Sequence, residues 1–136
     1  MKVAVRYFTR SGNTKKLADA IANVAGIKAE TMDVKVGDDV DLLFLGSSVY
    51  AAGVDDQVKE FITKINPNIK KVVCFSTAAI LKSTYAQVSK LLAQKNITVD
   101  SREFHCRGSF TIMHKGHPNN EDIIAVEKFT KDILKG

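Results

Sequence analysis

Side chains that donate hydrogen bonds surround a single glycine near the N-terminus. The segment consists of Thr9, Arg10, Ser11, Gly12, Asn13 and Thr14. It follows a mostly apolar run, residues 3–8, and precedes a stretch with helical spacing, residues 13–25. The first-turn amides of a helix lack intrahelical partners, and the helix dipole places partial positive charge there. A helix cap needs only one such polar residue, whereas this segment has several donors beside a glycine. It therefore predicts an anion site suited to phosphate.

Two common phosphate motifs do not fit this segment. The G-K-[ST] ending of a Walker loop is absent, and a single glycine excludes the G-x-G-x-x-G dinucleotide pattern. The segment resembles instead the T-x-[ST]-G-N-T loop of flavodoxins, which holds the 5′-phosphate of FMN after the first strand. The resemblance implies FMN as the cofactor and residues 9–14 as its phosphate site.

Length and composition are those of an ordinary globular protein. The 136 residues predict one domain, residues 1–136, with 45% hydrophobic and 26% charged side chains. No apolar run approaches the roughly 20 residues of a membrane span, and no signal peptide is visible. Cys74 and Cys106 form no C-x-x-C pair, and free thiols are expected. We therefore expect a cytoplasmic protein without membrane contact.

The charge balance is basic. The net charge of +5 arises from 20 lysines and arginines against 15 acidic residues. Most lysines occur singly, which indicates a solvated surface rather than a nucleic-acid-binding patch. Electron carriers of the flavodoxin family are typically strongly acidic, so this chain departs from that pattern.

Hydrophobic periodicity alternates between strand and helix. Strands are predicted at residues 2–8, 27–33, 41–47, 70–76 and 97–104, and helices near 13–25, 55–66, 83–95 and 120–135. The third and fourth strands are continuous apolar runs, typical of strands covered on both faces. The fifth alternates apolar and polar residues and reads as an edge strand.

This alternation predicts the α/β class, a doubly wound five-stranded parallel sheet that is flavodoxin-like. The expected strand order is 2-1-3-4-5, with the ligand site beyond the carboxyl ends of strands one and three. The connection over residues 34–40 is too short for a full helix and predicts a reduced or irregular crossover.

The loops after strands three and four are the candidates for holding the flavin. Residues 46–53 look like the flavodoxin G-[ST]-P-x-[YW] turn, with Ser48 in place of the usual proline. The resemblance makes Ser47 a candidate for the ribityl chain or phosphate, and Tyr50 for stacking on the ring. Backbone groups after strand four are candidates for the pyrimidine edge. The candidate residues from these two loops are Ser47, Ser48, Val49, Tyr50, Ala51, Ser76, Thr77, Ala78 and Ala79.

The region after strand five allows other interpretations. Its residues 106–118 are candidates for contact with the flavin edge or with a partner. A zinc ion is a weaker alternative, because no compact ligand pair accompanies the candidate ligands His105, Cys106, His114 and His117. We therefore assign no metal ligands. No Ser–His–Asp or paired-carboxylate pattern predicts a catalytic residue.

Three functional hypotheses follow. The first is an FMN-binding electron-transfer protein that serves a protein redox partner, for which an acidic face would complement the basic chain. The second is a flavin-dependent reductase of NAD(P)H or quinones, although the short chain leaves no insertion for a substrate pocket. The third is a flavin-free module that binds anions or other proteins.

Overall fold

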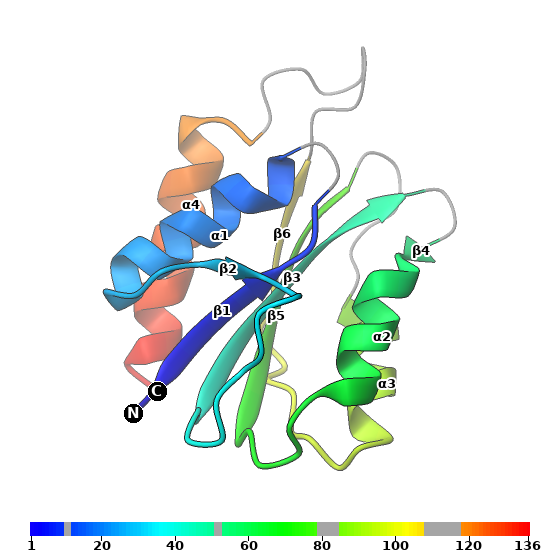
Figure 1. Ribbon diagram of the computed structural model, residues 1–136. Helices are drawn as coiled ribbons and strands as arrows, with labels where there is room; N and C mark the ends of the chain where they lie inside the picture. The colour runs from blue at the N-terminus through cyan, green and yellow to red at the C-terminus, as the bar shows by residue number, and fades with distance from the viewer. Residues whose placement is uncertain (10–11, 51–52, 79–84, 108–117) are drawn as a thin grey trace.

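The computed structural model describes residues 1–9, 12–50, 53–78, 85–107 and 118–136. Strands and helices alternate along the chain (Figure 1). In order, the elements are β1 (Val3–Tyr7), α1 (Asn13–Ala25), β2 (Glu30–Thr31), β3 (Leu42–Tyr50), β4 (Gly53–Val54), α2 (Asp56–Lys64), β5 (Lys71–Ala78), α3 (Tyr85–Ala93), β6 (Phe104–Arg107) and α4 (Asn120–Leu134).

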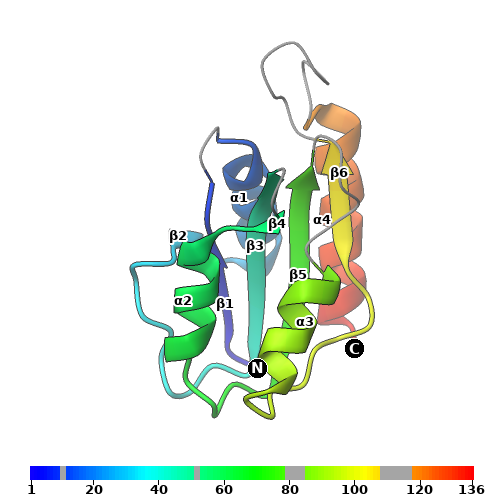
Figure 2. The same ribbon diagram turned by 90° about the vertical axis from the view of Figure 1, so that its right-hand side faces the viewer.

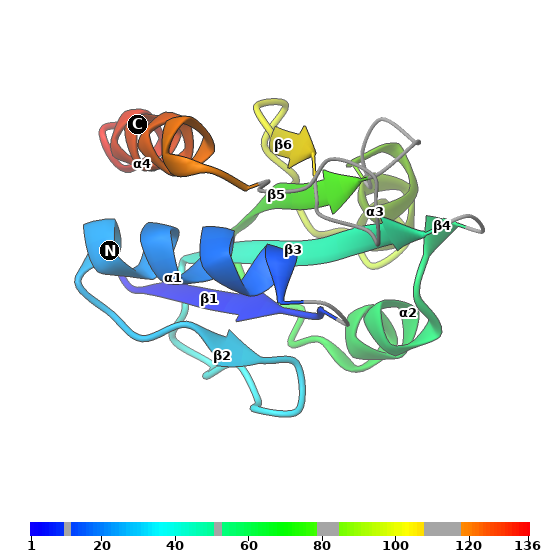
Figure 3. The ribbon, with the colours of Figure 1, turned by 90° about the horizontal axis from the view of Figure 1, so that it is seen from above.

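The sheet has the strand order β2-β1-β3-β5-β6, and every neighbouring pair on this path is parallel. Counted over these parallel strands, the order is the predicted 2-1-3-4-5. Helices α1 and α4 cover one face, and α2 and α3 cover the other (Figures 2 and 3). The doubly wound α/β prediction is therefore confirmed.

The apolar runs in the central strands fill two cores, one on each face of the sheet. In β3, Leu43 and Leu45 pack in the cluster with α2 and α3. Their neighbours Leu42 and Phe44 pack in the cluster with α1 and α4. Because successive strand residues point to opposite faces, a strand buried on both faces needs no polar alternation. The continuous run that predicted a parallel strand is explained by this arrangement.

The predicted fifth strand at residues 97–104 was wrong in position. The observed edge strand β6 begins at Phe104, and the earlier segment contributes a single bridge, between Val72 and Val99. Asp100 interrupts the strand, because its Oδ1 accepts the Arg102 amide at 2.9 Å and closes a local turn. The second strand is likewise shorter than the predicted 27–33, with only Glu30–Thr31 paired to β1.

The central strands run further than their apolar stretches suggest. β3 continues to Tyr50 and β5 to Ala78, in a register that pairs Ser47 with Ser76 and Val49 with Ala78. β4 then folds back antiparallel on the last two residues of β3. Residues 46–50 therefore belong to a strand rather than to the predicted loop. Hydrogen bonds between the strand backbones form whether the side chains are apolar or polar, so the pairing extends beyond the apolar run.

The connection from β2 to β3 contains no helix, as its length predicted. A buried arginine of β1 holds it instead. Arg6 donates from Nε to the Val34 carbonyl and from Nη2 to the Lys35 carbonyl, each at 2.8 Å. Glu30 lies 3.8 Å from the same guanidinium. Burial lowers the pKa of Arg6, and the charge of Glu30 opposes that shift.

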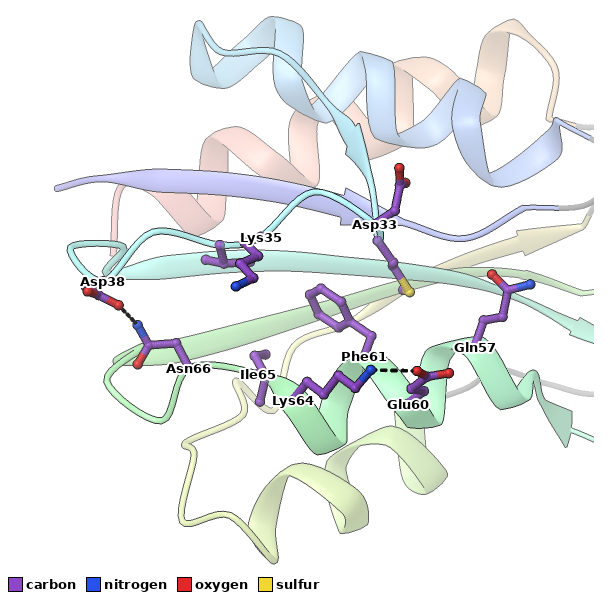
Figure 4. Close-up of a pocket in the computed structure, with 11 residues that line it drawn as sticks. Asp33, Lys35, Asp38, Gln57, Glu60, Phe61, Lys64, Ile65 and Asn66 are labelled. Atoms are coloured by element: carbon purple, nitrogen blue, oxygen red, sulfur yellow. Dashed lines mark hydrogen bonds and ion pairs between the residues drawn. The ribbon is translucent and has the colours of Figure 1, made fainter.

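A cavity of about 570 Å³ lies between this connection and α2. Phe61 of α2 points into it, across from Lys35 (Figure 4). The cavity lies on the α2 side of the chain, and its lining, as far as the structure describes the chain, contains none of the candidate cofactor residues.

None of the helices in the described part of the chain is both long and apolar enough to span a membrane.

Candidate functional site

Buried polar side chains gather where β1, β3 and β5 end. Each of them is at most 2% exposed, and they are Asn13, Thr14, Ser47, Ser76 and Thr77. The ends of β3 and β5 and the start of α1 lie in the upper part of Figure 1. The preceding parts of β3 and β5 are apolar and buried. Because burying polar groups costs free energy unless they are hydrogen-bonded, their concentration at one edge marks a candidate site. This edge is the topological switch point at which open α/β sheets bind ligands.

The N-terminus of α1 differs from those of α2 and α4. Asp55 caps α2 by accepting the Gln57 amide, and a capping box formed by Asn119 and Asp122 begins α4. Both of these helices also carry acidic residues in the first turn. In α1 the cap position is Gly12, with no side-chain cap bond and no acidic residue in the first turn. Within the described residues, no carboxylate of the first turn offsets the positive end of this dipole, which suits an external anion.

Gly12 is required here by backbone conformation. Its φ of 86° lies in the left-handed region, where side chains are strained. A Cβ atom at this position would meet no described atom within 4 Å, so steric crowding is not the reason for glycine. The Gly12 amide donates to Thr9 Oγ1 at 2.9 Å, and this bond closes the turn between β1 and α1.

A hydroxyl pair joins α1 to β5. Thr14 Oγ1 lies 3.1 Å from Thr77 Oγ1, and both residues are fully buried. The resemblance implies a place at the phosphate for Thr14 and at the ring for Thr77, but no pattern in the sequence predicts their contact. The two predicted parts of the cofactor site are therefore in direct contact through these hydroxyls.

The remaining predicted site residues fall into three groups. Ser47 and Ser76 are register neighbours, and strand alternation places both on the α2 and α3 face. Only the backbone can be described for Ser48, Val49, Tyr50 and Ala78, which lie at the ends of β3 and β5. The others lie outside the described residues and are Arg10, Ser11, Ala51 and Ala79. Stacking by Tyr50 therefore remains a prediction.

The cysteines lie in the two cores. Cys74 is buried as expected, and burial, reinforced by Glu103, raises its pKa to about 12. Cys106 packs on the α1 and α4 side, where burial, with a smaller contribution from Asp122, also raises its pKa to about 12. Because thiolates are the reactive form, both thiols are poor nucleophiles in the folded chain.

The residues of the zinc alternative are only partly described. His105 Nδ1 lies 2.7 Å from Glu103 Oε1 on the exposed edge strand. Its neighbour Cys106 points to the opposite face of the sheet. His114 and His117 lie outside the described residues. Within the part of the chain that the structure describes, no three His, Cys, Asp or Glu residues are placed to hold a metal ion.

Comparison with known proteins decides the family. A sequence profile of the flavodoxin domain matches residues 4–109. The chain belongs to the flavodoxin family. Membership agrees with the resemblance of the 9–14 segment and supports the FMN prediction made from it.

Relatives of this flavodoxin family member cover nearly its whole length. An uncharacterised protein of Methanocaldococcus jannaschii is 33% identical over 90% of this chain and 91% of its own. A flavodoxin from the domain Archaea superimposes with a TM-score of 0.81 at 20% identity, covering 99% of this chain and 97% of that one. Oxidised Flavodoxin 2 from Bacillus cereus gives a TM-score of 0.74 at 16% identity, covering 99% of both chains. At these identities the two solved structures show the shared fold.

Proposed function

We propose that this flavodoxin family member binds FMN non-covalently and transfers electrons to or from a protein redox partner. The N-terminus of α1 is the observation that carries the proposal. It presents a glycine in the left-handed region and no acidic first-turn residue at the switch point of the sheet. These features suit a phosphate dianion, which an acidic first turn would repel.

The residues have separate roles in this proposal. Residues 9–14 bind the phosphate, and Ser47 lies toward the ribityl chain. Tyr50 and the backbone of residues 76–79 are assigned to the ring. When bound, the flavin supplies the redox chemistry, while the protein binds and orients it.

The buried groups at this edge favour a carrier over a reductase. Those in the described residues are hydroxyls of Ser and Thr and the amide of Asn13. Such groups donate hydrogen bonds but do not act as general acids or bases near neutral pH. We therefore rank the NAD(P)H or quinone reductase second and the flavin-free module third. Oxidation of NADPH or NADH by the FMN-loaded protein would place the reductase above the electron carrier.

The redox partner is proposed from charge alone. With a net charge of +5, the chain complements a partner that presents an acidic face. Such an encounter should weaken as salt shortens the Debye length, which is about 10 Å at 0.1 M.

A ligand titration tests the cofactor proposal. FMN and riboflavin differ only in the phosphate, so their relative affinity measures the α1 site. A hydrogen bond to a charged group is worth about 1.5–3 kcal/mol, so we expect FMN to bind at least about 10- to 150-fold more tightly. Gly12→Val should remove this preference by straining the turn. Equal affinity of the wild type for the two ligands would contradict the proposal.

A further inference from the structure

Thr14 and Thr77 form a buried hydrogen bond between their hydroxyls, which is more than close packing of two side chains requires. Their Oγ1 atoms lie 3.1 Å apart between α1 and β5, and neither residue is exposed. Valine and threonine are both β-branched and similar in size, so a Thr-to-Val change removes the hydroxyl and keeps most of the packing volume. Each of the two residues also has a further interaction, so their hydroxyls belong to a larger polar group at this edge of the sheet. The hydroxyls are therefore candidates for a role in binding.

Thr14 stands where this role would matter. It is the second residue of α1 and the last residue of the segment assigned to the phosphate. A hydroxyl carries one hydrogen and two acceptor lone pairs. Either hydroxyl can donate in this hydrogen bond. When Thr77 donates, Thr14 Oγ1 accepts, and the hydrogen of the Thr14 hydroxyl points away from Thr77.

We propose that Thr77 is a positioning residue for the FMN phosphate. Its hydroxyl holds that of Thr14 in the orientation in which Thr14 contacts the phosphate. The inference rests on the proposed FMN function. It gives Thr77 a role through its side chain, in addition to the ring contact through the backbone that the resemblance implied.

The experiment is a fluorescence titration of FMN and riboflavin with Thr77→Val and the wild type. A net neutral hydrogen bond corresponds to about a 3- to 10-fold change in affinity. We expect FMN to bind about 3- to 10-fold more weakly to Thr77→Val, while riboflavin binds within twofold of the wild type. Thr77→Ser retains the hydroxyl and should restore the preference for FMN.

A matched control separates this effect from the general loss of a buried hydroxyl. Thr130 is equally buried, and its Oγ1 donates to the Val126 carbonyl within α4. Thr130→Val should leave the ratio of the two affinities unchanged. If Thr77→Val does not fold, Thr77→Ala removes the same hydroxyl with a smaller side chain.

A double-mutant cycle adds an independent readout. If Thr77 acts through Thr14, then Thr77→Val should have no further effect on FMN affinity in a Thr14→Val background.

The outcomes distinguish the two proposals. No preference for FMN in the wild type would overturn the FMN function itself. If the wild type prefers FMN, an unchanged preference in Thr77→Val would overturn the positioning role alone. The positioning role would also be overturned if Thr77→Val weakened the binding of FMN and riboflavin equally, or if the effects of the two substitutions on FMN affinity were additive. Either result would assign Thr77 to packing.

Discussion

The ring of Phe75 occupies the space into which a side chain at Gly46 would project. A Cβ atom at Gly46 would lie 2.2 Å from the Cε2 and Cζ atoms of that ring. The two residues are register neighbours on β3 and β5, immediately before Ser47 and Ser76. The glycine that sequence analysis assigned to a turn therefore accommodates an aromatic side chain beneath the candidate site.

The first prediction follows from this contact. Gly46→Ala should destabilise the fold by about 1–3 kcal/mol, because the methyl group forces Phe75 out of its position. Phe75→Leu alone should also destabilise, through the lost ring volume. The combination should cost less than the sum of the two, since the smaller side chain makes room for the methyl. Urea unfolding of the three variants measures this coupling, and strict additivity would contradict the steric explanation.

The second prediction concerns acid stability. Asp100 is 8% exposed and accepts from Arg102 Nε at 3.1 Å and Nη2 at 2.8 Å. This side-chain bonding, opposed in part by burial, lowers the pKa of Asp100 to about 2. A lowered folded-state pKa contributes stability above the unfolded value near 3.9, and this contribution is lost as pH falls toward 2.

Asp100→Asn should therefore lower the free energy of unfolding by about 1–2 kcal/mol at pH 7, and by less at pH 3. Asp38→Asn provides the control, because Asp38 is an exposed carboxylate that bonds the Asn66 side chain. Urea midpoints at pH 7, 5 and 3 give the comparison. A loss in Asp100→Asn that is constant with pH would exclude the ionised carboxylate as its cause.

The third prediction concerns Arg6. Arg6→Met should cost about 2–4 kcal/mol, because the Val34 and Lys35 carbonyls lose their charged donor. Arg6→Lys should recover little of this loss, since an ammonium group cannot reproduce the forked geometry. Amide hydrogen exchange should show faster exchange over residues 32–40 in both variants, while α4 serves as the internal reference. Full recovery by lysine would show that charge alone holds the connection.

Local patterns in the sequence determined much of this fold and the start of α1, where phosphate binding remains a prediction. Residues 13–25 form the predicted helix, and the predicted cap Asp55 accepts the Gln57 amide. The apolar runs at residues 42–45 and 72–75 predicted strands covered on both faces, and these strands are β3 and β5. These features were predictable because helical period, capping and burial on both faces depend on residues close together in the chain.

Tertiary structure decided the features that depend on distant partners. Thr14 and Thr77 are 63 residues apart, and only the packing of α1 on β5 brings their hydroxyls together. The extension of β3 through Ser47 depends on pairing with β5. The path of the connection between β2 and β3 depends on Arg6, whose Nε donates to the Val34 carbonyl 28 residues away. No local period encodes these contacts, because the free energy of each comes from a partner that the folded sheet supplies.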